Sequence, residues 1–105
     1  MVEAKLDQLA RLWEDFRSLP FPRGFYRREP DGTCMVSMDM YLAGCVLSAM
    51  NGPLDDWRRD VLLKDAPVLE KILPSIADDD YAAKYFAHLH AMAVLAAEID
   101  TARSA

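Results

Sequence analysis

Three arginines and two aromatic residues gather in one short stretch of an otherwise acidic sequence. The stretch runs from Arg23 to Glu29 and interleaves its arginines with Phe25 and Tyr26. Guanidinium groups bind carboxylates through paired hydrogen bonds, and a tyrosine or glutamate can transfer a proton when its environment shifts its pKa. These residue types predict a site for a peptide or another carboxylate. The candidate substrate-binding residues are Arg23, Phe25, Arg27 and Arg28. The alternative is a solvated ribbon whose arginines neutralise an acidic body.

Asp39 is a further candidate, because it interrupts the apolar stretch from Met35 to Met50. A buried carboxylate without a partner destabilises the fold or acquires a raised pKa. We therefore expect Asp39 to cap a helix or to pair with Arg27 or Arg28, whose segment precedes it in the sequence. The candidate catalytic residues are Tyr26, Glu29 and Asp39.

The histidines and cysteines do not have the spacing of a metal site. His88 and His90 are two residues apart in an expected helix, so their side chains point in different directions. Cys34 and Cys45 lie among apolar neighbours, which indicates two small buried side chains instead of a disulfide or a zinc site. The sequence contains no phosphate-binding glycine motif and no nucleophile motif. We expect neither a metal nor a cofactor.

The composition favours one small domain that does not bind nucleic acid. The chain has 105 residues, of which 52% are hydrophobic, and 17 acidic against 12 basic residues give a net charge of −5. That charge disfavours nucleic acids and anionic membranes, which both attract basic surfaces. The longest apolar run is too short to span a bilayer, and the N-terminus does not resemble a signal peptide. We expect a cytoplasmic protein and, because small helical domains often complete their cores by association, a homodimer.

Apolar residues recur at helical spacing through most of the sequence. They predict helices at residues 2–18, at 38–50, from 53 to a break or kink at 67, from there to 74, and at 79–101. The helix at 38–50 is apolar on nearly every side, which is typical of a buried helix, and Ser37 is its expected N-cap. Asp78–Asp80 are expected to cap the last helix, and residues 102–105 are expected to fray.

The segment between the first two helices predicts a β-hairpin at about residues 25–36. Pro30, Asp31 and Gly32 form a turn signal, because proline presets φ and glycine accepts a positive φ. Apolar or aromatic residues flank this turn and indicate strands near 25–28 and 33–36. The expected fold class is therefore mainly α, a single domain over residues 1–105 with four to five helices and one short β-hairpin.

Part of the sequence resembles a group of small helical bacterial proteins that includes the lysinoalanine synthases of cinnamycin- and duramycin-type lantibiotic pathways. The resemblance covers about residues 20–60 and lies in Gly24-Phe25-Tyr26-Arg27-Arg28-Glu29, Asp31-Gly32, Met38-Asp39 and Ala43-Gly44-Cys45. It implies a cofactor-free, dimeric enzyme that binds a modified precursor peptide. Such an enzyme directs a lysine amine onto a dehydroalanine, while a hydroxyl or carboxylate of the substrate assists as the base. That chemistry depends mainly on positioning two peptide groups.

A second interpretation is a non-catalytic acidic binding protein of the immunity type, because acidic surfaces complement basic partners. Its expected binding surface is a flat face made of acidic residues: Asp55, Asp56, Asp60 and Asp78–Asp80. The two interpretations predict different structures. A hollow beside residues 25–39 with converging arginine, tyrosine and carboxylate groups favours the enzyme. A flat acidic face favours the binding protein.

Overall fold

A computed structural model describes residues 2–104 of the chain. Four α-helices make up most of this part: α1 (Val2–Arg17), α2 (Met35–Asn51), α3 (Asp56–Ile72) and α4 (Asp80–Ser104). Three short 3-10 helices lie between them: η1 (Arg23–Tyr26), η2 (Pro30–Gly32) and η3 (Leu73–Ile76). The prediction of a mainly α domain with four to five helices is confirmed.

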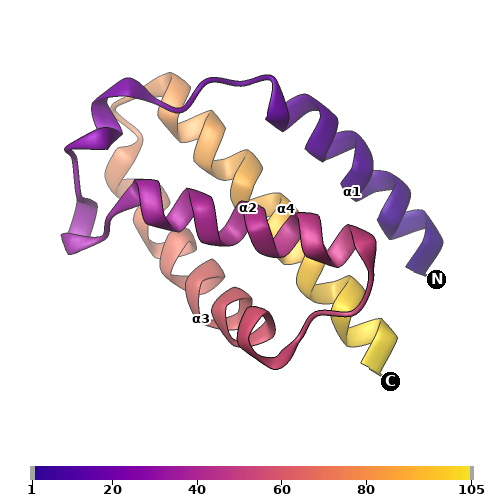
Figure 1. Ribbon diagram of the computed structural model, residues 1–105. Coiled ribbons are helices and arrows are strands. Elements are labelled where there is room, and N and C mark those ends of the chain that lie inside the picture. The colour runs from indigo at the N-terminus through magenta and orange to yellow at the C-terminus, as the bar shows by residue number, and fades with distance from the viewer. Residues whose placement is uncertain (1, 105) are drawn as a thin grey trace.

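Helix α4 is the centre of the domain, because α1, α2 and α3 all pack against it. Figure 1 shows α2 crossing in front of α4, with α1 and α3 on opposite sides. The core contains fully buried side chains from all four helices, including Leu9, Leu42, Leu69, Leu89 and Met92. Burial of these apolar groups supplies the main driving force for folding, about 25 cal/mol for each Å² of apolar surface.

The connection between α1 and α2 is not a β-hairpin, and that prediction is wrong. Asp31 (φ 54°) and Gly32 (φ 77°) both adopt left-handed backbone conformations, and they close a tight turn inside η2. The flanking segments do not pair as strands. On one side Phe25 is drawn into the core, where its ring lies 5.4 Å from that of Phe86. On the other side Met35 already belongs to α2, because it starts the buried series that continues with Met38.

Helix α2 therefore begins three residues before its predicted start, and Cys34 rather than Ser37 precedes it as N-cap. The helix ends at Asn51, close to the prediction, and Gly52 follows with φ 151°. Arg103 stabilises this end from the last turn of α4. Its guanidinium donates hydrogen bonds of 2.6 Å to the carbonyl oxygens of Ala49 and Gly52.

Helix α3 differs from the prediction at its start and in its middle. Asp55 is the N-cap, and its Oδ1 accepts a 2.8 Å hydrogen bond from the backbone N–H of Arg58. Pro67 lies inside the helix without ending it. The hydrogen bond that proline cannot donate would have reached the carbonyl of Leu63, and both residues are exposed, so that solvent can bind this carbonyl. Helix α4 continues through Ser104, three residues beyond its predicted end, and residue 105 lies outside the described residues.

Candidate functional site

Arg28 holds the loop before α2 against the start of α4. Its guanidinium donates two hydrogen bonds to the carboxylate of Asp78, at 3.1 and 3.0 Å, and a third of 3.0 Å to the carbonyl of Ser75. The same guanidinium carbon lies 5.0 Å from the ring centre of Phe25. The hydrogen bond from Arg28 also lowers the pKa of Asp78. These partners occupy the fork that the sequence suggested for a substrate carboxylate.

The charged neighbours of Arg28 in the arginine-rich stretch lie at the surface. Arg23, Arg27 and Glu29 are exposed, and none of them forms an ion pair within residues 2–104. The side chain of Tyr26 is 63% exposed, although its ring contacts Phe21 at 4.9 Å between centres. No side-chain hydrogen bond or ion pair within residues 2–104 joins any two of the predicted substrate-binding and catalytic groups, although the ring of Phe21 contacts both Tyr26 and Tyr85, the partner of Asp39.

Asp39 pairs with a tyrosine instead of the expected arginine. The hydroxyl of Tyr85 donates a 2.7 Å hydrogen bond to Oδ1 of Asp39, so the predicted pair with Arg27 or Arg28 is wrong. Burial raises the pKa of Asp39, while the hydrogen bond from Tyr85 acts in the opposite direction. Tyr85 is not predictable as this partner from the sequence, because it lies 46 residues from Asp39, on a helical stripe whose spacing indicates only core packing.

The surroundings of Cys34, Cys45 and His88 do not indicate a metal site. Cys45 is buried, as predicted, but Cys34 is exposed, because it lies before the first turn of α2 rather than inside the core. Nε2 of His88 lies 2.8 Å from the carbonyl oxygen of Leu12, which joins α4 to α1. Within residues 2–104, no group of three or more histidine, cysteine, aspartate or glutamate side chains is placed to hold a metal ion.

The aspartates proposed for a flat acidic face lie in two separate groups. Asp55, Asp56 and Asp60 are at the start of α3, whereas Asp78–Asp80 are at the start of α4. Twelve residues of α3 follow Asp60 before the helix ends at Ile72, a helix length of about 18 Å. Asp79 caps α4 as predicted, since its Oδ1 accepts a 3.0 Å hydrogen bond from the N–H of Ala82. The aspartates therefore act mainly at helix ends.

The outer side of α2 carries an exposed apolar surface. Five large apolar side chains are exposed there and at the start of α3: Val36, Met40, Tyr41, Leu47 and Trp57. We call this set the α2–Trp57 face. The rings of Tyr41 and Trp57 meet edge to face at 6.3 Å between centres, and the guanidinium carbon of Arg58 lies 5.9 Å from the Trp57 ring centre. The sequence signal for this face was the apolar character of α2 on every side.

Three hollows of the structure lie away from the arginine-rich stretch. Their volumes are about 410 to 620 Å³, and they are lined by residues of all four α-helices and of the α2–α3 connection. Residues 23–39 line none of these three. One of them, of about 410 Å³, opens beside the α2–Trp57 face and is lined by Leu47, Arg58 and the connecting residues 51–55.

Comparison of the chain with models of known families, with curated proteins and with solved structures finds no match. No helix within residues 2–104 has the length and apolar character needed to cross a membrane.

Proposed function

We propose that this protein is a non-catalytic binding protein whose α2–Trp57 face docks a basic, amphipathic segment of another protein. The observation that carries the proposal is the uncovered apolar side of α2. Among the 17 residues of α2, Asp39 alone carries a charge at neutral pH. A helix that is apolar on every side is normally covered on every side, yet Met40 is 59% exposed and Trp57 is 60% exposed.

The residue types of the face are those that contribute most to protein–protein binding. Tryptophan, tyrosine and arginine are enriched among the residues whose removal weakens a complex, and methionine adapts its shape to a partner. Trp57 and Tyr41 support each other through their ring contact. Such side chains supply a large contact area and lose little conformational freedom when they bind. The face therefore fits the apolar side of a docked helix or strand.

The charges around the face favour a basic partner. Arg58 and Arg59 are already paired, with Asp55 at 2.5 Å and with Asp100 at 2.6 Å. Asp60, one turn from Trp57, forms no ion pair within residues 2–104. The whole chain carries a net charge of −5. A positively charged segment would therefore be attracted to this surface.

The lysinoalanine synthase activity implied by the resemblance remains a prediction. Its expected site at residues 23–29 lacks a bordering hollow among the three described above. One of its candidate arginines, Arg28, is held by Asp78 and Ser75. The binding function uses a surface that is open in the structure, and it is the better supported of the two.

Titration calorimetry with a designed peptide tests the binding function. The probe is an amphipathic helical peptide with leucines on one side and lysines on the other, and its counterpart carries glutamates in place of the lysines. We expect saturable binding of the lysine peptide and much weaker binding of the glutamate peptide. Truncating a central aromatic residue commonly weakens a complex about tenfold or more, so Trp57→Ala should weaken binding by that factor.

A pair of matched variants locates the binding surface. Met40 on the face and Leu63 on α3 are almost equally exposed, at 59% and 58%. Met40→Ser should weaken binding of the lysine peptide several-fold, whereas Leu63→Ser should leave it unchanged. Circular dichroism and a thermal unfolding curve confirm that each variant is folded. Equal affinity for the two peptides, or equal binding by parent, Met40→Ser and Trp57→Ala, would overturn the proposal.

A further inference from the structure

A second uncovered surface lies on α4, on the side away from α2. The exposed residues of α4 recur every three or four positions along one side of the helix: Lys84, Ala87, Ala91, Val94, Glu98 and Thr101. Helices α1 and α3 pack on either side of this row, and no helix within residues 2–104 covers it. We call this row and its two flanking hollows the α4 face.

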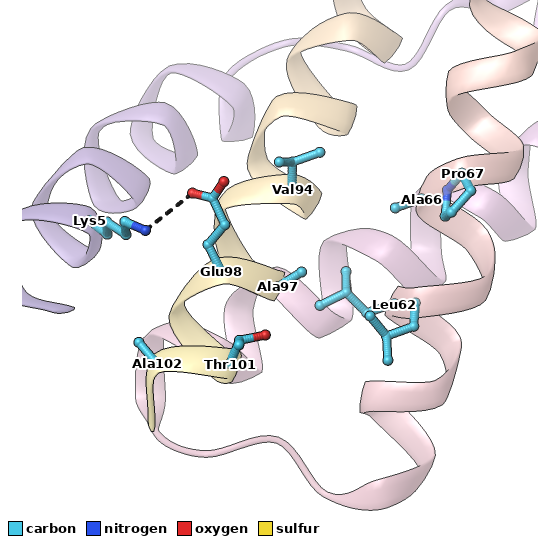
Figure 2. A pocket seen from close by; sticks show the side chains of 10 residues that line it. Lys5, Leu62, Ala66, Pro67, Val94, Ala97, Glu98, Thr101 and Ala102 are labelled. Atoms are coloured by element: carbon cyan, nitrogen blue, oxygen red, sulfur yellow. Dashed lines mark ion pairs between the residues drawn. The ribbon is translucent and has the colours of Figure 1, made fainter. Parts of the chain in front are cut away.

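Hollows run along both edges of the row. On the α3 side, a hollow of about 620 Å³ is lined by Leu62, Leu63, Ala66 and Pro67 together with Val94 and Ala97 (Figure 2). On the α1 side, a hollow of about 420 Å³ includes Gln8 and Leu12. Lys5 and Glu98 form an ion pair of 3.5 Å that contributes to both hollows. The face is thus mainly apolar, with charged groups near its ends.

The charged groups on α4 itself are placed symmetrically. Lys84 lies seven residues before Ala91, and Glu98 lies seven residues after it. Seven residues are close to two helical turns, so all three side chains are on the same side of the helix. Lys84 forms no ion pair within residues 2–104, and the pair between Glu98 and Lys5 is about half exposed. When two copies of this row lie antiparallel, Lys84 of one copy is therefore opposite Glu98 of the other.

We propose that the α4 face binds a second copy of this chain, with the two α4 helices antiparallel and a two-fold axis at Ala91. In this arrangement Lys84 of each protomer lies opposite Glu98 of its partner, which forms two equivalent ion pairs. The same surface then serves both chains, as a two-fold interface requires. A parallel pairing would instead bring like charges together.

The side chains around the axis suit close helix packing. Ala87, Ala91 and Val94 are small, and small contact residues allow two helix axes to approach to about 8 Å. Leu63 is 58% exposed at the edge of the larger hollow. Dimerisation would cover it together with Val94 and remove apolar surface from water. This interface is separate from the α2–Trp57 face, so the dimer and the binding function can fail independently.

Sedimentation velocity over a range of protein concentrations tests the dimer. The chain has a mass of 11.9 kDa, and we expect a concentration-dependent species of twice that mass, weakened by added salt because its ion pairs are exposed. Ala91→Arg should abolish the dimer, since the two arginines would meet at the axis. Ala91 is exposed in the protomer, so the variant should remain folded, as circular dichroism can verify.

A charge exchange tests the antiparallel register. Lys84→Glu and Glu98→Lys should each raise the dimer dissociation constant about tenfold or more, because each creates two like-charge contacts. The double variant should restore part of the association, since both pairs between the chains are re-formed with reversed charges, whereas the ion pair with Lys5 inside each chain is lost. The two positions are fourteen residues apart, about 21 Å along one helix, so the rescue has to act between chains.

Lys64→Glu provides the matched control, because Lys64 is exposed on α3 and lies outside the α4 face. It should leave the dissociation constant unchanged. A purely monomeric parent would overturn the proposal, and so would a dimer that persists in Ala91→Arg. Weakened single variants without rescue in the double variant would overturn the antiparallel register.

Discussion

The hydroxyl of Tyr85 on α4 donates a 2.7 Å hydrogen bond to the carboxylate of Asp39 on α2, and this bond crosses the interface between the two helices. Burial raises the pKa of Asp39 above its ordinary value. It also raises the pKa of Tyr85, and the neighbouring carboxylate adds to that shift. In the folded protein Tyr85 is therefore neutral, and ionised Asp39 is less favourable than it would be in water.

Replacing Tyr85 with phenylalanine should cause a pH-dependent loss of stability, because the carboxylate of Asp39 loses its hydrogen-bond donor. A hydrogen bond to a charged group contributes about 2 kcal/mol, so Tyr85→Phe should lower the free energy of unfolding by about that amount at neutral pH. This loss should become smaller in acid. Because the pKa of Asp39 is raised in the folded state, Asp39 binds a proton there more readily than in the unfolded state, and the hydroxyl of Tyr85 then no longer serves a charged group. Urea unfolding at several pH values measures this. Tyr41→Phe is the control, because the exposed Tyr41 hydroxyl has no hydrogen bond within residues 2–104.

The same pair determines the alkaline behaviour of the protein. Because the pKa of Tyr85 is raised on folding, its contribution to stability is fully present below the ordinary tyrosine pKa of about 10 and is lost as the pH rises above it. Asp39→Asn should reduce the effect of Tyr85→Phe at neutral pH, since no charge is then left without its donor. An equal effect of Tyr85→Phe in both backgrounds would show that the two groups are not coupled.

Asp100 should be the most sensitive carboxylate for the stability of the domain. It is 4% exposed and accepts a 2.6 Å hydrogen bond from Nε of Arg59 and one of 3.3 Å from the N–H of Leu54. Removing one partner of a buried ion pair costs about 3 kcal/mol, so Asp100→Ala should lower the free energy of unfolding by about that much. Asp60→Ala, at an exposed site, should change it by less than about 0.5 kcal/mol.

Acid should weaken this contact in a defined direction. The hydrogen bond from Arg59 lowers the pKa of Asp100. Its contribution to stability is therefore present above the ordinary aspartate pKa of about 3.9 and is lost as the pH falls further. The difference in stability between the parent and Asp100→Ala should accordingly decrease in strong acid. A difference that stays constant with pH would contradict the assignment.

Arg27 and Arg28 are neighbours with different expected roles. Arg28→Ala removes the contacts to Asp78 and Ser75, which are exposed to solvent, so the loss of stability should be small. It should also speed proteolytic cleavage of the segment between α1 and α2. Arg27→Ala should change neither quantity. Cleavage at equal rates in the two variants would show that Arg28 does not hold the segment.

Arg27 also provides a test of the lysinoalanine prediction. If the arginine-rich stretch holds a substrate carboxylate, Arg27→Ala should lose crosslinked product while remaining folded. The addition does not change the mass of the peptide, so the product has to be detected by fragmentation or by thiol trapping of the remaining dehydroalanine. Crosslinking at the level of the parent would count against the site.

The two cysteines should differ in reactivity. Cys34 is exposed, and the hydroxyl of Ser37 donates a 3.5 Å hydrogen bond to its sulfur, which lowers the pKa of the thiol. Cys45 is buried, and burial raises its pKa. Because the thiolate is the reactive form, a maleimide should label one cysteine rapidly in the native protein and both in denaturant. Ser37→Ala should slow the labelling of Cys34 near neutral pH.

Sequence reasoning located the long helices because their apolar spacing agrees with their final environment. The hairpin failed for a tertiary reason. The turn at Asp31 and Gly32 formed as expected, but the core took Phe25 on one side and Met35 on the other, and this left no pair of strands. A break or kink is predicted at Pro67, but α3 is continuous there, because a proline on an exposed side of a helix leaves only a solvent-accessible carbonyl without its partner.

The candidate site was harder to predict, because its contacts join distant parts of the chain. The partners of Arg28 and Asp39 lie about fifty residues away, at Asp78 and Tyr85, and local sequence does not indicate which long-range pair will form. The α2–Trp57 face was missed for a different reason. An all-apolar sequence predicts that α2 is buried on every side, whereas this domain has too few helices to cover α2 completely.

The open side of α2 and the open side of α4 face away from each other across the thickness of the molecule. Two chains joined through α4 would therefore present their α2 surfaces outward, as a bivalent dimer. A partner that carries two docking segments would bind both α2 surfaces, and its second segment would bind at the high local concentration set by the first. Weak individual contacts would then suffice for long-lived capture.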